Sequence, residues 1–147
     1  MGRTAQCACG QFSVRVSGEP KFVIACSCLG CQRRTGSVFA VNAYFRNEQL
    51  QAKSGRFKIH SYVSDAGRQV CKHFCPECGT TVCAIAEFQP GMTCFAVGCF
   101  ADPNFPQPIA SAWNRHRHDW VEFPLQCAAS QTQDFKMRSA LAHGECG

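Results

Sequence analysis

Seven of the 13 cysteines in this chain stand in three tight groups. The groups are Cys7 with Cys9, Cys26 with Cys28 and Cys31, and Cys75 with Cys78. Thiolates at such spacings are typical metal ligands. Structural zinc sites are filled by four protein ligands, whereas sites that do chemistry keep one position open. The two pairs therefore predict a closed structural site, and the triplet predicts an open site that could meet a substrate.

The predicted four-cysteine site joins two distant parts of the chain. In a strand, residues i and i+2 share a face, so Cys7 and Cys9 could direct both sulfurs at one metal. Between Cys75 and Cys78, proline favours a tight turn, and Gly79 permits the positive φ that turns backbone N–H groups toward thiolates. We favour zinc, although four thiolates also suit iron, and buried free cysteines or a redox pair are the alternatives.

The triplet is followed directly by Arg33 and Arg34. Guanidinium groups beside an open metal could bind the carboxylates of a substrate through paired hydrogen bonds, and a solvated turn is the alternative. The triplet could also be closed by a fourth thiolate, which would make it purely structural. The candidates for that ligand are Cys71, Cys83, Cys94 and Cys99.

Composition predicts one globular domain. The chain has 147 residues, of which 46% are hydrophobic and 17% are charged. Seven thiolates and two Zn²⁺ ions together contribute −3, which lowers the formal charge of +5 to +2. The densest basic run, Arg115-His116-Arg117-His118, is short. These features argue against nucleic-acid binding, which needs a continuous basic face.

Cysteine usage points to a reducing compartment. The number of cysteines is odd, and they cluster at metal-ligand spacings instead of spreading as disulfide partners. The first six residues contain no apolar stretch, and no run approaches the roughly 18 apolar residues of a membrane span. We therefore expect a cytoplasmic protein with no membrane partner, as a monomer or homodimer.

Apolar periodicity predicts a mainly β, mostly antiparallel fold. Alternation over residues 12–16 and 57–61 predicts half-buried strands, and apolar runs at 38–45, 80–86 and 93–97 predict further strands. Short helices are expected only at 47–51 and 134–143. Residues 1–126 are predicted to form the zinc-binding domain, and residues 127–147 a weakly ordered or short helical tail.

A second basic and aromatic segment spans residues 113–120. If it is extended, His116 and His118 share a face and could bind metal or act as a general acid or base. Surface histidines without a partner are the alternative. Trp113 and Trp120 are predicted to anchor the core rather than to bind substrate.

The three cysteine groups, with Gln32-Arg33-Arg34-Thr35-Gly36-Ser37 after the triplet and Phe74-Cys75-Pro76-Glu77-Cys78-Gly79 later, resemble the glutathione-dependent formaldehyde-activating enzyme family. That family also includes centromere protein V. The resemblance spans about residues 7–123. It implies a β-tent fold of stacked antiparallel sheets pinned by a structural zinc on Cys7, Cys9, Cys75 and Cys78. It further implies a catalytic zinc on Cys26, Cys28 and Cys31. One departure is Ser27, because the family usually has histidine there.

The resemblance implies a carbon–sulfur lyase that joins glutathione and formaldehyde into S-hydroxymethylglutathione. The open site would let a thiol lose its proton and meet a carbonyl carbon polarised by the same metal, with Arg33 and Arg34 as anion contacts. The thiol and the aldehyde are not fixed by the sequence. The alternative is a non-catalytic zinc module of the same fold that recognises a protein or a nucleic acid.

Overall fold

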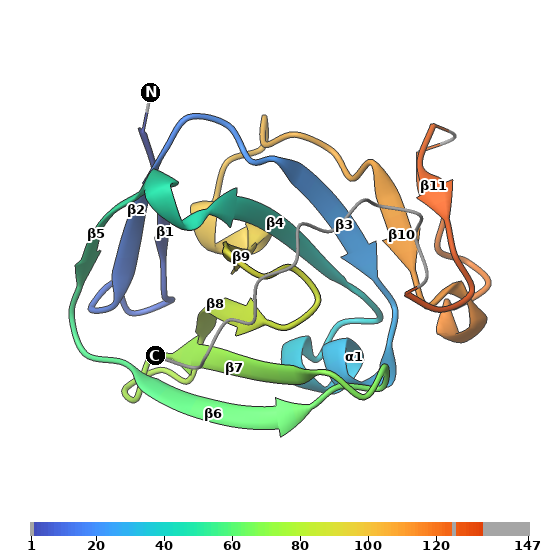
Figure 1. The fold of residues 1–147 in the computed structure, drawn as a ribbon, viewed down its shortest axis with the longest axis horizontal. Helices are drawn as coiled ribbons and strands as arrows, with labels where there is room; N and C mark the ends of the chain where they lie inside the picture. The colour runs from blue at the N-terminus through green and yellow to red at the C-terminus, as the bar shows by residue number, and fades with distance from the viewer. Residues whose placement is uncertain (1, 125, 134–147) are drawn as a thin grey trace.

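The computed structural model describes residues 2–124 and 126–133 and contains two β-sheets. The smaller sheet has the order β1-β2-β5 and is antiparallel throughout. Its strands are β1 (Gly2–Gln6), β2 (Ser13–Ser17) and β5 (Leu50–Ser54), which lie side by side at the left of Figure 1.

The larger sheet has eight strands in the order β11-β10-β3-β4-β9-β8-β7-β6. Among the described strands, only the pairings of β10 with β3 and with β11 are parallel. The strands are β3 (Phe22–Cys26), β4 (Ala40–Arg46), β6 (Lys58–Val63), β7 (Gln69–Phe74), β8 (Thr81–Ala86), β9 (Met92–Ala96), β10 (Ala110–Ala112) and β11 (Ala128–Ala129). The predicted mainly β, mostly antiparallel fold is confirmed.

Helices are short. The α-helix α1 (Leu29–Thr35) ends at Gly36, whose φ of 71° suits a left-handed C-cap. The 3₁₀ turns are η1 (Asn47–Gln49), η2 (Val97–Phe100) and η3 (Asn114–His116). The helix expected at 47–51 is therefore one 3₁₀ turn, and the helix expected at 134–143 lies outside the described residues.

The main core lies between the two sheets. Alternate residues of β2 contribute Val14 and Val16, which join Phe12 in facing Phe45 and Phe95 of the larger sheet. All five side chains are at most 1% exposed. Their burial confirms the alternation predicted for residues 12–16. Because burying a large apolar side chain contributes about 1.5–3 kcal/mol, this alternation decides which face of β2 packs against the larger sheet.

A second apolar cluster covers the opposite face of the larger sheet. Phe22, Ile24 and Cys26 of β3 belong to it, while Val23 belongs to the main core. Strand alternation therefore directs Cys26 away from the smaller sheet. The ring of Tyr44 stacks on that of Phe22, with centroids 4.6 Å apart. This face carries the three-cysteine cluster described below.

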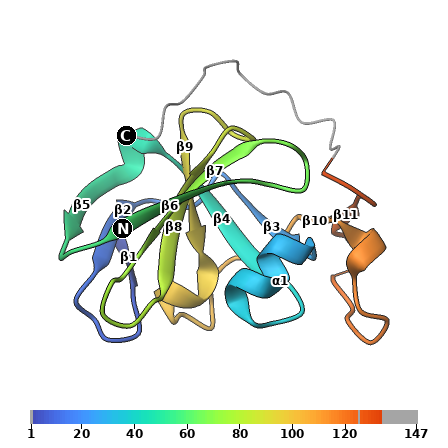
Figure 2. The same ribbon diagram turned by 90° about the horizontal axis from the view of Figure 1, so that it is seen from below.

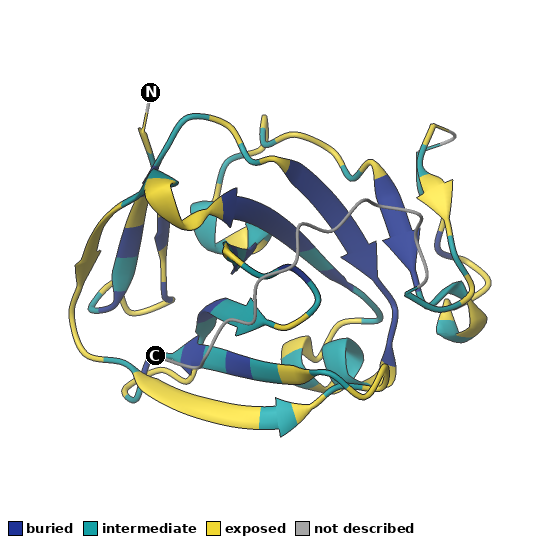
Figure 3. Ribbon diagram, viewed as in Figure 1, coloured by how far each residue is buried: buried dark blue, intermediate teal, exposed yellow. Residues whose placement is uncertain are grey.

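Two expectations about burial are wrong. The strand β6, predicted to be half-buried, is exposed at every position except Tyr62, because it is the last strand of the sheet and lacks a layer over it (Figure 3). Ile59 is 45% exposed and Val63 70% exposed. Trp120, predicted as a core anchor, is 72% exposed and contacts His118 edge-on.

The described part of the predicted tail pairs with the sheet. Ala128 and Ala129 of β11 align in parallel with Ala110 and Ser111 of β10. The predicted domain boundary at residue 126 stays a prediction. Within the described ranges, no helix is long and apolar enough to cross a membrane.

Gly55, between β5 and β6, should not tolerate a side chain. Its φ is 86°, and an added Cβ would lie 1.7 Å from the carbonyl oxygen of Gln11. We expect Gly55→Ala to lower the free energy of unfolding by about 3 kcal/mol or more, through overlap added to backbone strain. Denaturant unfolding measures this. Gly67→Ala is the matched control, because its φ is 76° and its Cβ would meet nothing within 4 Å. Gly67→Ala should lower the free energy of unfolding by only about 1 kcal/mol. Equal losses of stability in the two variants would contradict the predicted overlap at Gly55.

Candidate metal centre and adjoining cavity

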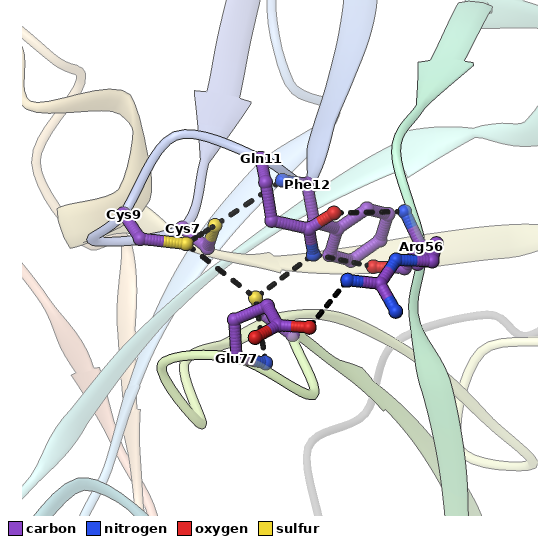
Figure 4. Close-up of polar contacts among 7 residues, drawn as sticks. Cys7, Cys9, Gln11, Phe12, Arg56 and Glu77 are labelled. Atoms are coloured by element: carbon purple, nitrogen blue, oxygen red, sulfur yellow. Dashed lines mark hydrogen bonds and ion pairs between the residues drawn. The ribbon is translucent and has the colours of Figure 1, made fainter.

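The four paired cysteines meet in space. The sulfurs of Cys7, Cys9, Cys75 and Cys78 all lie within 4.8 Å of one another. Cys9 Sγ is 3.7 Å from the sulfurs of both Cys7 and Cys75. Four sulfurs about 2.3 Å from one tetrahedral ion stand roughly 3.8 Å apart. The cluster therefore has the dimensions of a tetrathiolate metal site, of which Figure 4 shows the side of Cys7 and Cys9.

Two turns bring these sulfurs together. The predicted strand geometry for Cys7 and Cys9 is wrong, because β1 ends at Gln6 and a turn follows, with Gly10 N donating to Cys7 O at 3.0 Å. In the second turn, Gly79 N donates to Cys75 O at 2.8 Å, and the φ of Gly79 is 78°. Each turn brings its two sulfurs within 4.8 Å of each other.

Donors surround the sulfurs, as they do around thiolates. Phe12 N lies 3.3 Å from Cys7 Sγ, and Glu77 N lies 3.4 Å from Cys75 Sγ. The side chain of Gln11 donates to Cys75 Sγ at 2.9 Å and to Arg56 O at 2.7 Å (Figure 4). Sequence reasoning missed Gln11, because nothing in its spacing separates it from a surface glutamine.

Thr80 was missed for the same reason. Its hydroxyl lies 3.2 Å from Cys78 Sγ and accepts from Ala8 N at 3.2 Å, so it bridges the two turns. The hydrogen bond from Thr80 lowers the pKa of Cys78 to about 5. The pair therefore favours the charged form of a metal ligand.

The triplet is built where β3 runs into α1. Cys26 is the last residue of β3, and Cys28 is the N-cap of α1, its sulfur accepting from Cys31 N at 3.2 Å. The sulfurs of Cys26, Cys28 and Cys31 all lie within 4.8 Å of one another. Cys26 and Cys28 are buried, and Cys31 is half-buried.

The triplet holds negative charge most readily on Cys31. Hydrogen bonds from Cys26 and Cys28, with the nearby Arg34 guanidinium, lower the pKa of Cys31 to about 3. The pKa of Cys26 is raised, because its thiol keeps the proton that it shares with the other two sulfurs. A cation is needed for all three to ionise together.

A cavity of about 200 Å³ adjoins the triplet on the second apolar face of the sheet. All three cysteines line it, together with strands β3, β4 and β6–β9. Its aromatic lining consists of Tyr44, Tyr62, Phe88 and Trp113. A wider groove of about 720 Å³ adjoins this cavity and shares Arg34 with it. The triplet thus faces a space that a small molecule could occupy.

The two arginines after the triplet differ. Arg34 is half-buried, lines the cavity and donates to Asn42 Oδ1 at 3.4 Å, whereas Arg33 is exposed and does not line it. Consecutive helical residues face different directions, so α1 cannot present both. Of the two predicted anion contacts, Arg34 lines the cavity and Arg33 does not, and anion binding itself stays a prediction.

Two tyrosines give the cavity hydroxyl donors. Burial raises the pKa of Tyr44 well above its usual value and that of Tyr62 to about 12. Both therefore remain protonated at neutral pH. They were not predicted as site residues, because three strands separate β4 from β6 in the larger sheet and only the fold places both at one cavity.

Among the described residues, no fourth cysteine joins the triplet. Cys94 lines the same cavity, but its sulfur is not within the group of mutually close sulfurs. Cys83 and Cys99 contact the main core on the other face of the sheet. Cys71, the remaining candidate, is not among the mutually close sulfurs either, so within the described part of the chain the alternative of a closed second site lacks a cysteine to complete it.

Ser27 is fully buried between two candidate ligands and does not line the cavity. Its backbone N donates to Ala112 O at 3.1 Å, and its carbonyl accepts from Gln32 Nε2 at 2.9 Å. Its hydroxyl has no hydrogen-bond partner among the described residues. The backbone of Ser27 therefore joins β3 to β10 and α1, and its side chain does not reach the cavity to transfer a proton.

The histidines of residues 113–120 do not reach the triplet. Asn114–His116 of this segment form the 3₁₀ turn η3 and the segment is not a strand, which corrects the predicted shared face. His118 is exposed, and neither it nor His116 lines the cavity. His116 stacks on Trp113, with centroids 5.9 Å apart, and its carbonyl accepts from Gln32 at 3.2 Å. His116 thus contacts both α1 and Trp113.

The sulfur ligands of both cysteine clusters suit the zinc sites that were predicted for them. Four sulfurs at tetrahedral spacing with N–H donors suit a closed thiolate site. Three sulfurs that face a cavity suit a site with an open position. Both clusters could hold a metal ion.

Comparison with known proteins identifies the fold and the family of this chain. A crystal structure of a protein from Rhodobacter sphaeroides superimposes with a TM-score of 0.55 at 20% identity, covering 69% of this chain and 90% of that chain. At this identity the likeness concerns the fold alone. No curated protein matches the sequence. The sequence model described as "Glutathione-dependent formaldehyde-activating enzyme" matches residues 2–116. The chain therefore belongs to the glutathione-dependent formaldehyde-activating enzyme family.

Proposed function

We propose that this protein is a zinc-dependent carbon–sulfur lyase that makes and breaks a thiol–aldehyde adduct. Family membership supports the reaction class, and glutathione with formaldehyde is the pair in the family's description. The observation that carries the proposal is the three-cysteine cluster open to a cavity.

Cys7, Cys9, Cys75 and Cys78 would hold a structural zinc, and Cys26, Cys28 and Cys31 a catalytic one. When bound by the triplet, zinc supplies a Lewis acid that lowers the pKa of a thiol and polarises a carbonyl. The protein's own contribution is to orient both reactants beside it.

Arg34 supplies a positive charge at the junction of the cavity and the groove, where it can hold an anionic end of the thiol. Tyr44 and Tyr62 can donate hydrogen bonds to the carbonyl oxygen. The sulfur bonds to the carbonyl carbon while the thiol proton passes to the carbonyl oxygen. Atoms balance, and no oxidant or reductant is needed.

The proposal is tested in two steps on protein purified under reductant without chelator. Elemental analysis should give about two zinc ions per chain. Exchange NMR spectroscopy should then show faster interconversion of free and adduct forms for glutathione with formaldehyde or for another thiol–aldehyde pair. Protein with both metals that accelerates no pair would overturn the enzyme and favour a binding module.

A further inference from the structure

Two basic side chains line the cavity in addition to Arg34 beside the triplet. Arg68, at the end of the β6–β7 turn, and Lys72, in β7, are both half-buried and line it. In both ribbon views this turn lies toward the same end of the molecule as α1 and β11 (Figure 1 and Figure 2). The cavity therefore carries positive charge from two separate elements, α1 and the β6–β7 hairpin.

Neutral groups hold these two cations. Arg68 Nη1 donates to Gln133 Oε1 at 3.1 Å, and its guanidinium lies 5.4 Å from the Phe88 ring centroid. Lys72 Nζ lies 5.7 Å from the ring centroid of Tyr62. These contacts orient the charges and leave them unneutralised.

No carboxylate of the described residues pairs with either cation. Across residues 2–124 and 126–133, the ion pairs involve Arg3 and Arg56 only. Asp65 also lines the cavity, but it is exposed and makes no ion pair with Arg68 or Lys72. A cation that has lost part of its hydration gains from an opposite charge, so an anion from outside the described chain would complete the arrangement.

We propose that Arg68 and Lys72 form a carboxylate subsite for the substrate, whose reacting group meets the triplet. The identity of the reacting group rests on the proposed function, whereas the binding of a carboxylate by Arg68 and Lys72 does not depend on it. Formaldehyde carries no carboxylate, so the subsite serves a carboxylate of the thiol or of a larger carbonyl compound. Arg68 suits it through its planar donors, and Lys72 adds a second charge.

Residues 130–133, which lie beyond the family match, complete this subsite. The match ends at residue 116, and Gln133 positions Arg68 from beyond it. The same segment holds Trp113, whose φ of 57° is in the left-handed region, through a bond from Trp113 N to Thr132 O at 2.8 Å. Asn114 Nδ2 adds a bond to Ser130 O at 2.9 Å. Gln133 is therefore a positioning residue for the proposed subsite.

The experiment measures ligand binding by fluorescence of Trp113 in zinc-loaded Trp120→Phe protein. Trp113 lines the cavity and Trp120 is 72% exposed, so one reporter remains at the site. The thiol probes are 3-mercaptopropionate and 6-mercaptohexanoate, each compared with the mercaptoalcohol of the same length. The carbonyl probes are 4-oxobutanoate and butanal. We expect the carboxylate of at least one pair to tighten Kd by about 10- to 100-fold.

Arg68→Gln with Lys72→Gln should abolish this preference and leave the Kd of the neutral probes within about twofold. Gln133→Ala should reduce the preference several-fold and keep both charges. The matched control is Lys58→Gln, which removes one exposed positive charge of β6 outside the cavity and should change nothing. The pair of probes that shows the preference identifies the thiol or the carbonyl compound as its source.

Equal Kd values for the charged and neutral probes in all three pairs would overturn the subsite, even if turnover is observed. A preference that persists in the double variant would also overturn it. A preference that is lost in the double variant supports the subsite even where no thiol–aldehyde pair is turned over, a result that would reject the proposed function alone.

Discussion

Replacing Cys75 by serine should remove one zinc ion per chain and lower the free energy of unfolding by about 5 kcal/mol or more. Cys75 is fully buried, and its sulfur lies 3.7 Å from Cys9 Sγ and 2.9 Å from Gln11 Nε2. Because Cys7 and Cys75 are far apart in sequence, the ion would connect the β1–β2 hairpin to the β7–β8 hairpin. Its loss removes a cross-link between the two sheets.

Elemental analysis and denaturant unfolding of the same samples measure this result. The control is Cys127→Ser, a half-buried cysteine outside both clusters, which should change the free energy of unfolding by only about 0.5 kcal/mol. If Cys75→Ser retains both ions and its stability, the four cysteines do not form a structural metal site.

The cysteine groups and five of the eleven described strands (β2, β4, β6, β8 and β9) were accessible from the sequence because their signals are local. The i, i+2 and i, i+3 spacings predicted both clusters, and the alternation of Phe12, Val14 and Val16 predicted the buried face of β2. Alternation also occurs in β6, where Ile59 is exposed. The pattern describes two faces of a strand and does not say whether another layer covers either one.

The sequence could not predict which side chains from different strands would line the same cavity. Tyr44, Tyr62 and Lys72 come from β4, β6 and β7, and meet in one cavity only because the larger sheet curves around it. Arg33 and Arg34 could be separated only once the bounds of α1 fixed the direction of each side chain. The metal ligands were therefore predicted from spacing, whereas the substrate-facing residues required the fold.

Replacing Cys28 by serine should lower turnover of the adduct by about a thousandfold or more and remove the second zinc ion, with little loss of stability. Cys28 is both a candidate ligand and the N-cap of α1, where its sulfur accepts from Cys31 N at 3.2 Å. Serine is a favourable N-cap, so its hydroxyl can accept the same bond. Cys28→Ser therefore tests the loss of the metal ligand while the N-cap of α1 is kept.

Cys28→Ala completes the comparison, because alanine loses the ligand and the cap together. It should lose as much activity as Cys28→Ser and unfold about 1 kcal/mol more easily. Zinc content, turnover by exchange NMR spectroscopy and denaturant unfolding are measured on both variants, with Cys127→Ser as the control. Full zinc content and full turnover in Cys28→Ser would show that the triplet is not the reaction centre. Equal destabilisation by serine and alanine would mean that the second metal, rather than the cap, stabilises α1.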